Sequence, residues 1–301
     1  MRKKKLAIFY AVLAAALYAV NIPFSKLLML HISPTMMASF LYLGAGLGLF
    51  LLGAFFKLAG KGDKTEHLTK KELPYALAMV LLDIAAPILL MFGLRICTSA
   101  NVSLINNFEI VATSLIALFV FKEVISKKLW LAIALVTLAG IILTFEGKEA
   151  FDFNIGSLFV FGACVCWGLE NNCTRKISHK SSVEIVVIKG TFSGLGSLAV
   201  ALLLQESFPE AVWILVALVL GFVSYGLSIH FYINAQKELG AAKTSAYYAV
   251  APFLGVTFGM LFLGERPQIP FYFALAVMLF ASLLMICDSL GYSLFPSLKK
   301  K

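Results

Sequence analysis

The chain has 301 residues, of which 60% are hydrophobic and 14% are charged, and its net charge is +9. A soluble protein averages roughly 45–50% apolar and about 25% charged residues, so the composition argues against a soluble domain. The basic residues lie in short clusters between long apolar segments, a distribution that argues against a nucleic-acid-binding protein.

Apolar segments alternate with short polar breaks along the whole chain, beginning directly after the basic run Arg2–Lys5. A helix of about 20 apolar residues crosses a bilayer, and a backbone in lipid must satisfy its own hydrogen bonds. We therefore predict an all-α integral membrane protein with ten transmembrane helices. In chain order, the predicted spans are residues 6–28, 35–57, 73–95, 98–121, 127–146, 153–177, 182–204, 210–234, 243–263 and 270–291.

The basic residues test this number of spans, because lysine and arginine collect in cytoplasmic loops. With the N-terminus in the cytoplasm, 20 of the 25 basic residues fall in cytoplasmic segments, four in external segments and one, Lys189, within a span. A missed or extra span would destroy this alternation from that point onward. The charges therefore favour ten spans in the inner (cytoplasmic) membrane of a cell, with both termini cytoplasmic.

Two short sequence patterns recur in the second half of the chain. Residues Leu17–Asn21 of the first span resemble Cys166–Glu170 of the sixth. Residues Ala117–Glu123, at the end of the fourth span, resemble Gly259–Glu265, at the end of the ninth. A unit of five spans followed by a copy places the copy in the opposite orientation, because five is odd. We therefore predict a 5+5 inverted repeat, a common plan among secondary transporters.

The predicted repeats comprise residues 1–147, with helices 1–5, and residues 148–301, with helices 6–10. The residues that mark them are Asn21 and Glu123 in the first and Trp167, Gly168, Pro252, Gly264 and Glu265 in the second. This pattern resembles the drug/metabolite transporter (DMT) superfamily, in its EamA-type family, over essentially the whole chain. The resemblance implies a ten-helix transporter with a central cavity between two helix bundles, and many relatives export amino acids or other metabolites.

Polar and aromatic side chains at membrane depth are the candidate substrate-binding groups. Span 4 carries Asn106 and Asn107 in a polar stripe at helical spacing. In span 6, Trp167 and Glu170 are one turn apart, and an aromatic ring beside a carboxylate can hold an amino group. Interhelical hydrogen bonding is the alternative for the asparagines, and packing is the alternative for the tyrosines. The remaining candidates are Tyr18, Asn21, Tyr225 and Tyr248.

Three carboxylates at membrane depth, Asp83, Glu109 and Glu170, are the candidate proton carriers. Glu170 has an alternative role in an ion pair with Lys189, whose side chain could instead extend to the membrane interface. The excess of carboxylates favours a cationic or zwitterionic solute. No GxxxxGK[ST] motif is present, so we expect transport to be driven by a gradient rather than by ATP.

We interpret the sequence as a secondary transporter, and an exporter, of a small organic solute such as an amino acid, acting by alternating access with proton coupling as one option. A passive channel or facilitator, a membrane-embedded sensor and a membrane-embedded enzyme are the alternatives. No HExxH or GxSxG motif is present and the cysteines lack metal-binding spacing, so we expect no catalytic residue, metal or cofactor. The expected partners are a small-molecule substrate and the lipid bilayer, without nucleic acid, for a monomer or homodimer.

Overall fold

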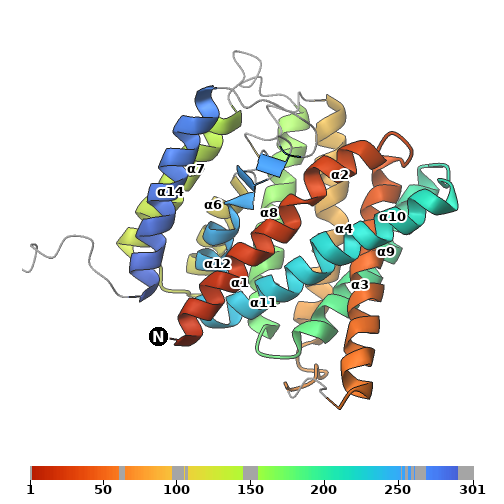
Figure 1. Ribbon diagram of the computed structural model, residues 1–301, viewed down its shortest axis with the longest axis horizontal. Coiled ribbons are helices and arrows are strands. Elements are labelled where there is room, and N and C mark those ends of the chain that lie inside the picture. The colour runs from red at the N-terminus through yellow and green to blue at the C-terminus, as the bar shows by residue number, and fades with distance from the viewer. Residues whose placement is uncertain are drawn as a thin grey trace, which may run out of the picture.

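The computed structural model describes residues 2–60, 65–96, 105, 108–144, 155–251, 253–254, 257–258, 261 and 269–290. Within these ranges the chain forms helices joined by turns and short loops, and they contain no strand. The helices pack together in one bundle (Figure 1). The all-α prediction is therefore confirmed for this part of the chain.

The helices of the first half follow predicted spans 1–5. Helices α1 (Arg2–Ala19) and α2 (Asn21–Leu28) together form span 1. They are followed by α3 (Pro34–Leu58), α4 (Leu73–Ile96), α6 (Phe108–Phe119) and α7 (Lys127–Thr144).

The helices of the second half follow predicted spans 6–10. They are α8 (Ile155–Ile177), α9 (Ser182–Leu203), α10 (Ala211–Gly221), the π-helical turn η2 (Phe222–Leu227), α11 (Ser228–Leu239), α12 (Ala241–Tyr248) and α14 (Ile269–Leu290). By length and composition, four helical segments of the described chain can cross a membrane: Pro34–Leu58, Leu73–Leu90, Ser182–Leu203 and Ala211–Leu239.

Spans 1 and 8 differ from the prediction in detail. Span 1 is interrupted at Val20, because Pro23 has no N–H group to donate to the carbonyl four residues earlier. Span 8 continues past its predicted end to Leu239, because the polar residues that follow the apolar segment are also helical. It stops before Gly240, whose φ of 84° is one that glycine adopts readily. Hydropathy located the spans, whereas proline and glycine set these helix breaks.

Helices α3 and α9 approach each other closely through small residues. A Cβ atom added to Gly46 would lie 2.7 Å from the Thr191 backbone nitrogen. One added to Gly194 would lie 2.8 Å from the Leu43 backbone nitrogen. Ser39 Oγ donates a hydrogen bond of 2.9 Å to the Gly194 carbonyl. Small residues of this kind let helices pack backbone to backbone in a membrane.

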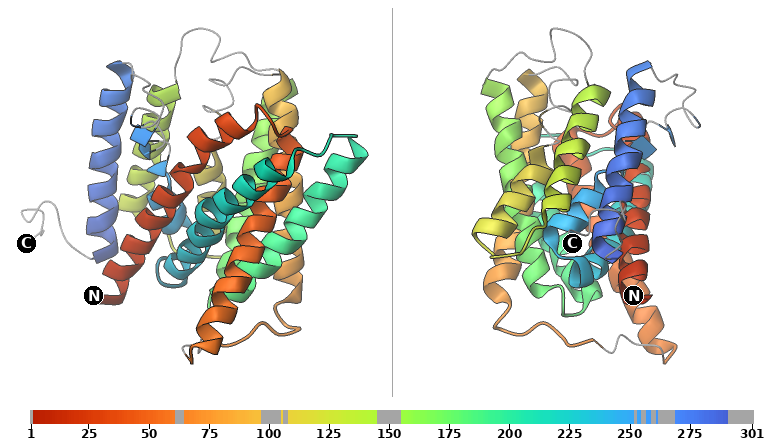
Figure 2. Two further views of the ribbon diagram at one scale, coloured as in Figure 1. Left: turned by 45° about the vertical axis from the view of Figure 1, so that its right-hand side comes forward. Right: turned by 90° about the vertical axis from the view of Figure 1, so that its left-hand side faces the viewer.

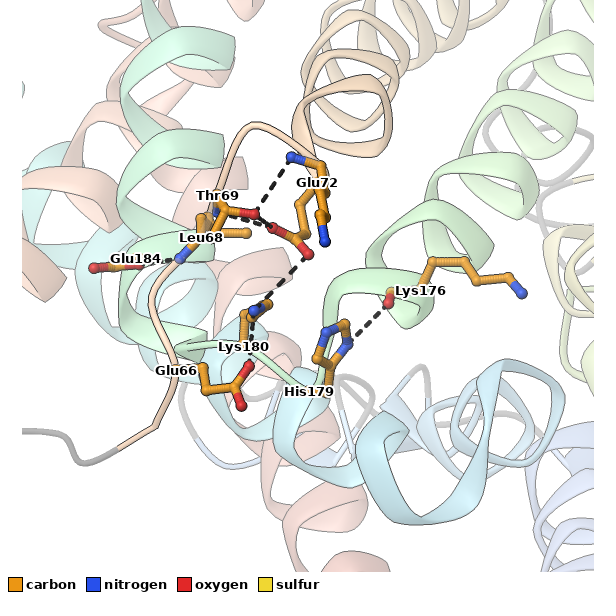
Figure 3. Close-up of polar contacts among 9 residues, drawn as sticks. Glu66, Leu68, Thr69, Glu72, Lys176, His179, Lys180 and Glu184 are labelled. Carbon is orange, nitrogen blue, oxygen red and sulfur yellow. Dashed lines mark hydrogen bonds and ion pairs between the residues drawn. The ribbon is translucent and has the colours of Figure 1, made fainter.

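Polar contacts hold the loop that follows α3 to the start of α9 (Figure 3). Lys180 Nζ lies 2.8 Å from Glu66 Oε2, and Leu68 N donates to Glu184 Oε2 over 2.9 Å. The Ser181 backbone nitrogen donates to the Glu66 carbonyl oxygen over 2.9 Å. The hydrogen bond and the charge of Lys180 lower the pKa of Glu66, which favours its charged form.

A similar arrangement lies at the opposite end of the helix pair. Glu206, in the loop after α9, accepts hydrogen bonds from Ser33 Oγ at 2.7 Å and Met36 N at 2.9 Å. Burial alone would raise the pKa of Glu206, but the hydrogen bonds from Ser33 and Thr35 outweigh burial and lower it. The loop after each helix of the pair therefore contacts the start of the other helix.

The other helices form two groups and one further pair. Helices α4 and α6 contact α8, helices α11 and α12 contact α1, and α7 pairs with α14. The start of α1 and the ends of α3 and α14 lie at one end of the bundle, and α2 lies at the other (Figure 2). These positions agree with the predicted order of spans, in which successive spans run in opposite directions.

Gly46→Ala is expected to lower the free energy of unfolding by about 1–3 kcal/mol, because the added methyl group would overlap the backbone of α9. Gly162→Ala is the matched control, since the nearest atom to its added Cβ lies 3.4 Å away. Alanine is the better helix former by about 1 kcal/mol, so this control should be neutral or stabilising. Unfolding of both purified variants in detergent measures the difference, and equal effects would contradict the close approach.

Candidate functional site

A buried lysine lies between two carboxylates inside the bundle. Lys189 Nζ on α9 is 3.0 Å from Asp83 Oδ2 on α4 and 2.8 Å from Glu170 Oε1 on α8. The exposed fractions of the three residues are 6%, 1% and 3%, in that order. Buried charges of opposite sign neutralise each other only when they are this close. One ammonium group therefore joins helices from both halves of the chain.

Hydroxyl groups complete the surroundings of both carboxylates. Thr174 donates a hydrogen bond to Glu170, and Tyr42 forms a hydrogen bond with Asp83. The ion pair with Glu170 that the sequence left open is present, and it includes Asp83 as well. The Lys189 side chain thus points into the bundle and does not extend to the membrane interface.

Glu109, in the first turn of α6, has different surroundings. Its Oε1 accepts a hydrogen bond of 3.1 Å from Asn171 Nδ2, which also lies 3.3 Å from Thr113 Oγ1. An amide is a neutral donor, so this contact does not neutralise the carboxylate. Glu109 is also half-buried, whereas the two carboxylates that hold Lys189 are buried. Of the three predicted proton carriers, Glu109 is therefore the most accessible.

Amide side chains fix the helices around this carboxylate. Asn172 Nδ2 donates to the carbonyl oxygens of Thr113 at 2.9 Å and Gly168 at 2.8 Å. Gln236 Nε2 on α11 donates to the Asn171 carbonyl oxygen at 3.0 Å. Buried amides bonded to the backbone of neighbouring helices join those helices where water is excluded. They thereby position Asn171, whose side-chain amide donates a hydrogen bond to Glu109 on α6.

Five tyrosine rings follow one another from Tyr42 on α3 to Tyr232 on α11. The ring centroids lie 5.2 Å apart for Tyr42 and Tyr225, and 5.7 Å apart for Tyr225 and Tyr18. They lie 5.4 Å apart for Tyr18 and Tyr248, and 5.0 Å apart for Tyr248 and Tyr232. These separations are typical of favourable aromatic contacts. The rings bring α1, α3, η2, α11 and α12 together.

Three of these tyrosines keep some accessible surface. The phenol groups of Tyr18, Tyr225 and Tyr248 are deeply buried, yet each side chain keeps some accessible surface. The family resemblance implies a central cavity, which we call the central chamber and for which Tyr18, Glu109, Tyr225 and Tyr248 are the predicted lining. It combines a carboxylate with three aromatic side chains.

The other predicted site residues lie on α8, on α2 or outside the described residues. Trp167 is half-buried on α8, one turn before the glutamate that binds Lys189. Asn21 is buried in α2, where it accepts a hydrogen bond of 2.7 Å from Ser25 Oγ. Asn106 and Asn107 lie outside the described residues. Substrate binding by all of these residues stays a prediction.

Sequence reasoning missed four residues of this network. Tyr42 is one aromatic residue among many in an apolar span, and nothing in its spacing distinguishes it. Asn171 and Asn172 carried a usable signal, two successive amides within a predicted span. Gln236 was missed because the predicted span 8 ended before it. The continuation of α11 to Leu239 brings it into the network.

Comparisons with known proteins bear on the whole chain. The model of the EamA-like transporter family matches residues 5–145 and 154–287. An uncharacterized transporter of Methanothermobacter thermautotrophicus is 24% identical over 278 residues, covering 84% of this chain and 78% of that protein. The uncharacterized transporter YyaM of Bacillus subtilis is 23% identical over 202 residues, covering 64% and 66%. A solved crystal structure that is 13% identical has the same fold, with a TM-score of 0.80 over 95% of this chain and 98% of that chain.

Lys189→Met is expected to lower the free energy of unfolding by about 3–5 kcal/mol, because it leaves two buried carboxylates without their cation. The triple variant Lys189→Met, Asp83→Asn, Glu170→Gln should regain most of that loss. Lys237→Met, at an exposed position of α11, is the matched control and should have little effect. Unfolding in detergent measures all three variants. A triple variant as unstable as Lys189→Met would show that packing, and not charge, sets the loss.

Proposed function

The chain belongs to the EamA-like transporter family and is a multi-pass membrane protein, and from that premise we propose that it is a secondary transporter of a small organic solute such as an amino acid or a related metabolite. Its relatives are named as transporters, which points to a transporter rather than an enzyme. The observation that carries the proposal is a group of partly accessible polar and aromatic residues on the helices of an apolar bundle, namely Glu109, Tyr18, Tyr225 and Tyr248.

We propose that residues 1–147 and 148–301 form an inverted repeat, which is a common plan among secondary transporters. The family model matches the chain twice in succession, once in each half. In such a repeat, each contact between two helices recurs between the corresponding helices of the other half. The contacts that support such a repeat are those of α3 with α9 and of α7 with α14, together with the pair α4–α8, which would correspond to the pair α11–α1. Repeats of this kind place the substrate site where the two halves meet.

We propose alternating access on the basis of the same arrangement. Helices α4 and α6 contact α8, and helices α11 and α12 contact α1, so each group combines helices from both halves. We place the central chamber between these two groups. The close pair α3–α9 connects them. Rocking of the two groups about this pair would expose the chamber to one side of the membrane and then to the other.

We further propose export across the cytoplasmic membrane, with both termini in the cytoplasm. The direction rests on the resemblance to a superfamily that contains many exporters. The orientation rests on the basic residues, most of which lie in loops that would face the cytoplasm. The start of α1 and the end of α14 at the same end of the bundle support it (Figure 2).

Proton coupling is assigned to Glu109 in this proposal. Asp83 and Glu170 share Lys189, so protonating either one would disrupt an ion pair. Glu109 accepts a hydrogen bond from a neutral amide and is half-buried, so a proton can bind there without displacing a cation. The three candidate proton carriers thus separate into two structural carboxylates and one available carboxylate.

The solute is found by a thermal-shift screen of the purified protein against amino acids, amines, nucleosides and vitamins. A ligand that binds only the folded state raises the melting temperature. Counterflow of that solute in proteoliposomes then separates a carrier from a channel or facilitator. A carrier gives saturable flux and transient accumulation of labelled solute, whereas linear flux without counterflow would contradict the proposal.

Glu109→Gln is expected to abolish the stimulation of uptake by a pH gradient and to keep at least part of the exchange of labelled for unlabelled solute. The physical reason is that exchange needs no net proton movement. Glu238→Gln, at an exposed position of α11, is the matched control and should behave as the parent protein. Unchanged pH-gradient stimulation in Glu109→Gln would remove Glu109 from the coupling role.

A further inference from the structure

We propose that Glu123 is a conformational latch, whose carboxylate holds the start of α12 against the end of α6 and so keeps one end of the bundle closed. This is the end that we assign to the cytoplasm. The inference rests on the proposed alternating access, and it identifies a contact that must break when the two helix groups separate at that end.

The backbone ties Glu123 to α6. This helix ends at Phe119, and the chain then turns through Lys122, whose φ is 57°. The backbone nitrogen of Glu123 donates a hydrogen bond of 2.8 Å to the carbonyl oxygen of Ala117, in the last turn of α6. A residue with positive φ followed by such a bond is a common way for a helix to end. The Glu123 side chain is therefore expected to move with α6.

The carboxylate of Glu123 caps the start of α12. Its Oε2 accepts a hydrogen bond of 3.2 Å from the backbone nitrogen of Ala241, the first residue of that helix. The residue before the helix, Gly240, has no side chain with which to cap it. The first N–H groups of a helix lack partners within the helix and favour a negative charge nearby. Glu123, 118 residues earlier in the chain, supplies both the acceptor and the charge.

Gly240 leaves room for this carboxylate. The three atoms nearest to an added Cβ atom all belong to the carboxyl group of Glu123, and Oε1 would overlap it. The backbone of Gly240 has a φ of 84° and a ψ of 171°, a conformation that is open essentially to glycine alone. One glycine therefore begins α12 and admits the side chain that comes from α6.

The contact crosses between the two proposed helix groups. Helix α6 contacts α8, whereas α12 contacts α1 and α11, and α6 and α12 also contact each other. Rocking that opens this end has to draw the end of α6 away from the start of α12. Glu123 is half-buried, so water can replace Ala241 as the partner of its carboxylate once the helices separate. Lys189 differs, because separating it from its two buried carboxylates would leave charges unpaired inside the bundle.

Spin labels on Leu6 of α1 and Phe119 of α6, both exposed, report the distance between the groups at this end. Pulsed electron paramagnetic resonance on the full chain in liposomes, without added solute, gives the populations of short and long distances. Glu123→Ala should raise the ratio of the open to the closed population by about tenfold to a hundredfold, the usual effect of losing a hydrogen bond to a charged group. Glu123→Gln keeps an acceptor but loses the charge, and it should raise the ratio by about two- to fivefold. An unchanged distribution in either folded variant would overturn the latch.

Glu206→Ala is the matched control. Glu206 also accepts a hydrogen bond from a backbone nitrogen in the first turn of a helix, that of Met36 at 2.9 Å, but this contact lies within the α3–α9 pair and its loops. Its loss should lower the melting temperature and leave the distance between the labels on Leu6 and Phe119 as in the parent protein. Equal population shifts in Glu206→Ala and Glu123→Ala would show a general loosening of the bundle and would overturn the latch.

Distances and flux separate the latch from the transport function on which it rests. If Glu123→Ala opens this end and no solute shows counterflow in the parent protein, the latch stands and the carrier function falls. If a solute shows counterflow and the distances in Glu123→Ala match those of the parent protein, the carrier function stands and the latch falls.

Discussion

The structure depends on the neutralisation of one buried positive charge. A lysine ammonium in a membrane bundle is costly unless carboxylates lie beside it, and Lys189 has two, on α4 and α8. This requirement fixes three helices relative to one another and occupies two of the three carboxylates near the chamber. Glu109 is left with an amide partner and an accessible face. The position of Lys189 thus determines that Asp83 and Glu170 form ion pairs and that Glu109 does not.

The α3–α9 pair gives the rest of the bundle a common support. Its glycines bring the two backbones close together, and a polar loop contact closes the pair at each end (Figure 3). The two helix groups that bound the chamber lie around this pair. A tightly packed pair with more loosely connected groups around it suits a protein whose groups move as units. We place the chamber between these units, where such motion would change its access.

The sequence predicts the helices of this protein better than it predicts their contacts. Hydropathy places α3, α4 and α9 within a few residues, because lipid requires a long apolar segment for each crossing. It cannot show that Lys189 contacts Asp83, since their separation in the chain carries no periodic signal. The contacts of Asn171 and Gln236 likewise depend on how the helices pack, and hydropathy does not predict them. Tyr18, Tyr225 and Tyr248 were predicted individually, but their ring-to-ring order depends on how α1, η2 and α12 pack.

The central claim is that one chamber opens alternately to the two sides of the membrane. Spin labels on the exposed residues Leu30 and Ile155 report the end of the bundle that carries α2, and labels on Leu6 and Lys176 report the opposite end. Leu6 lies on α1, Ile155 and Lys176 lie on α8, and Leu30 follows α2, which continues span 1 after α1. Pulsed electron paramagnetic resonance in liposomes, with and without transported solute, measures both distances. The account predicts that the solute shifts them in opposite directions, so that one end opens as the other closes. Two unchanged distances during continued flux would contradict it.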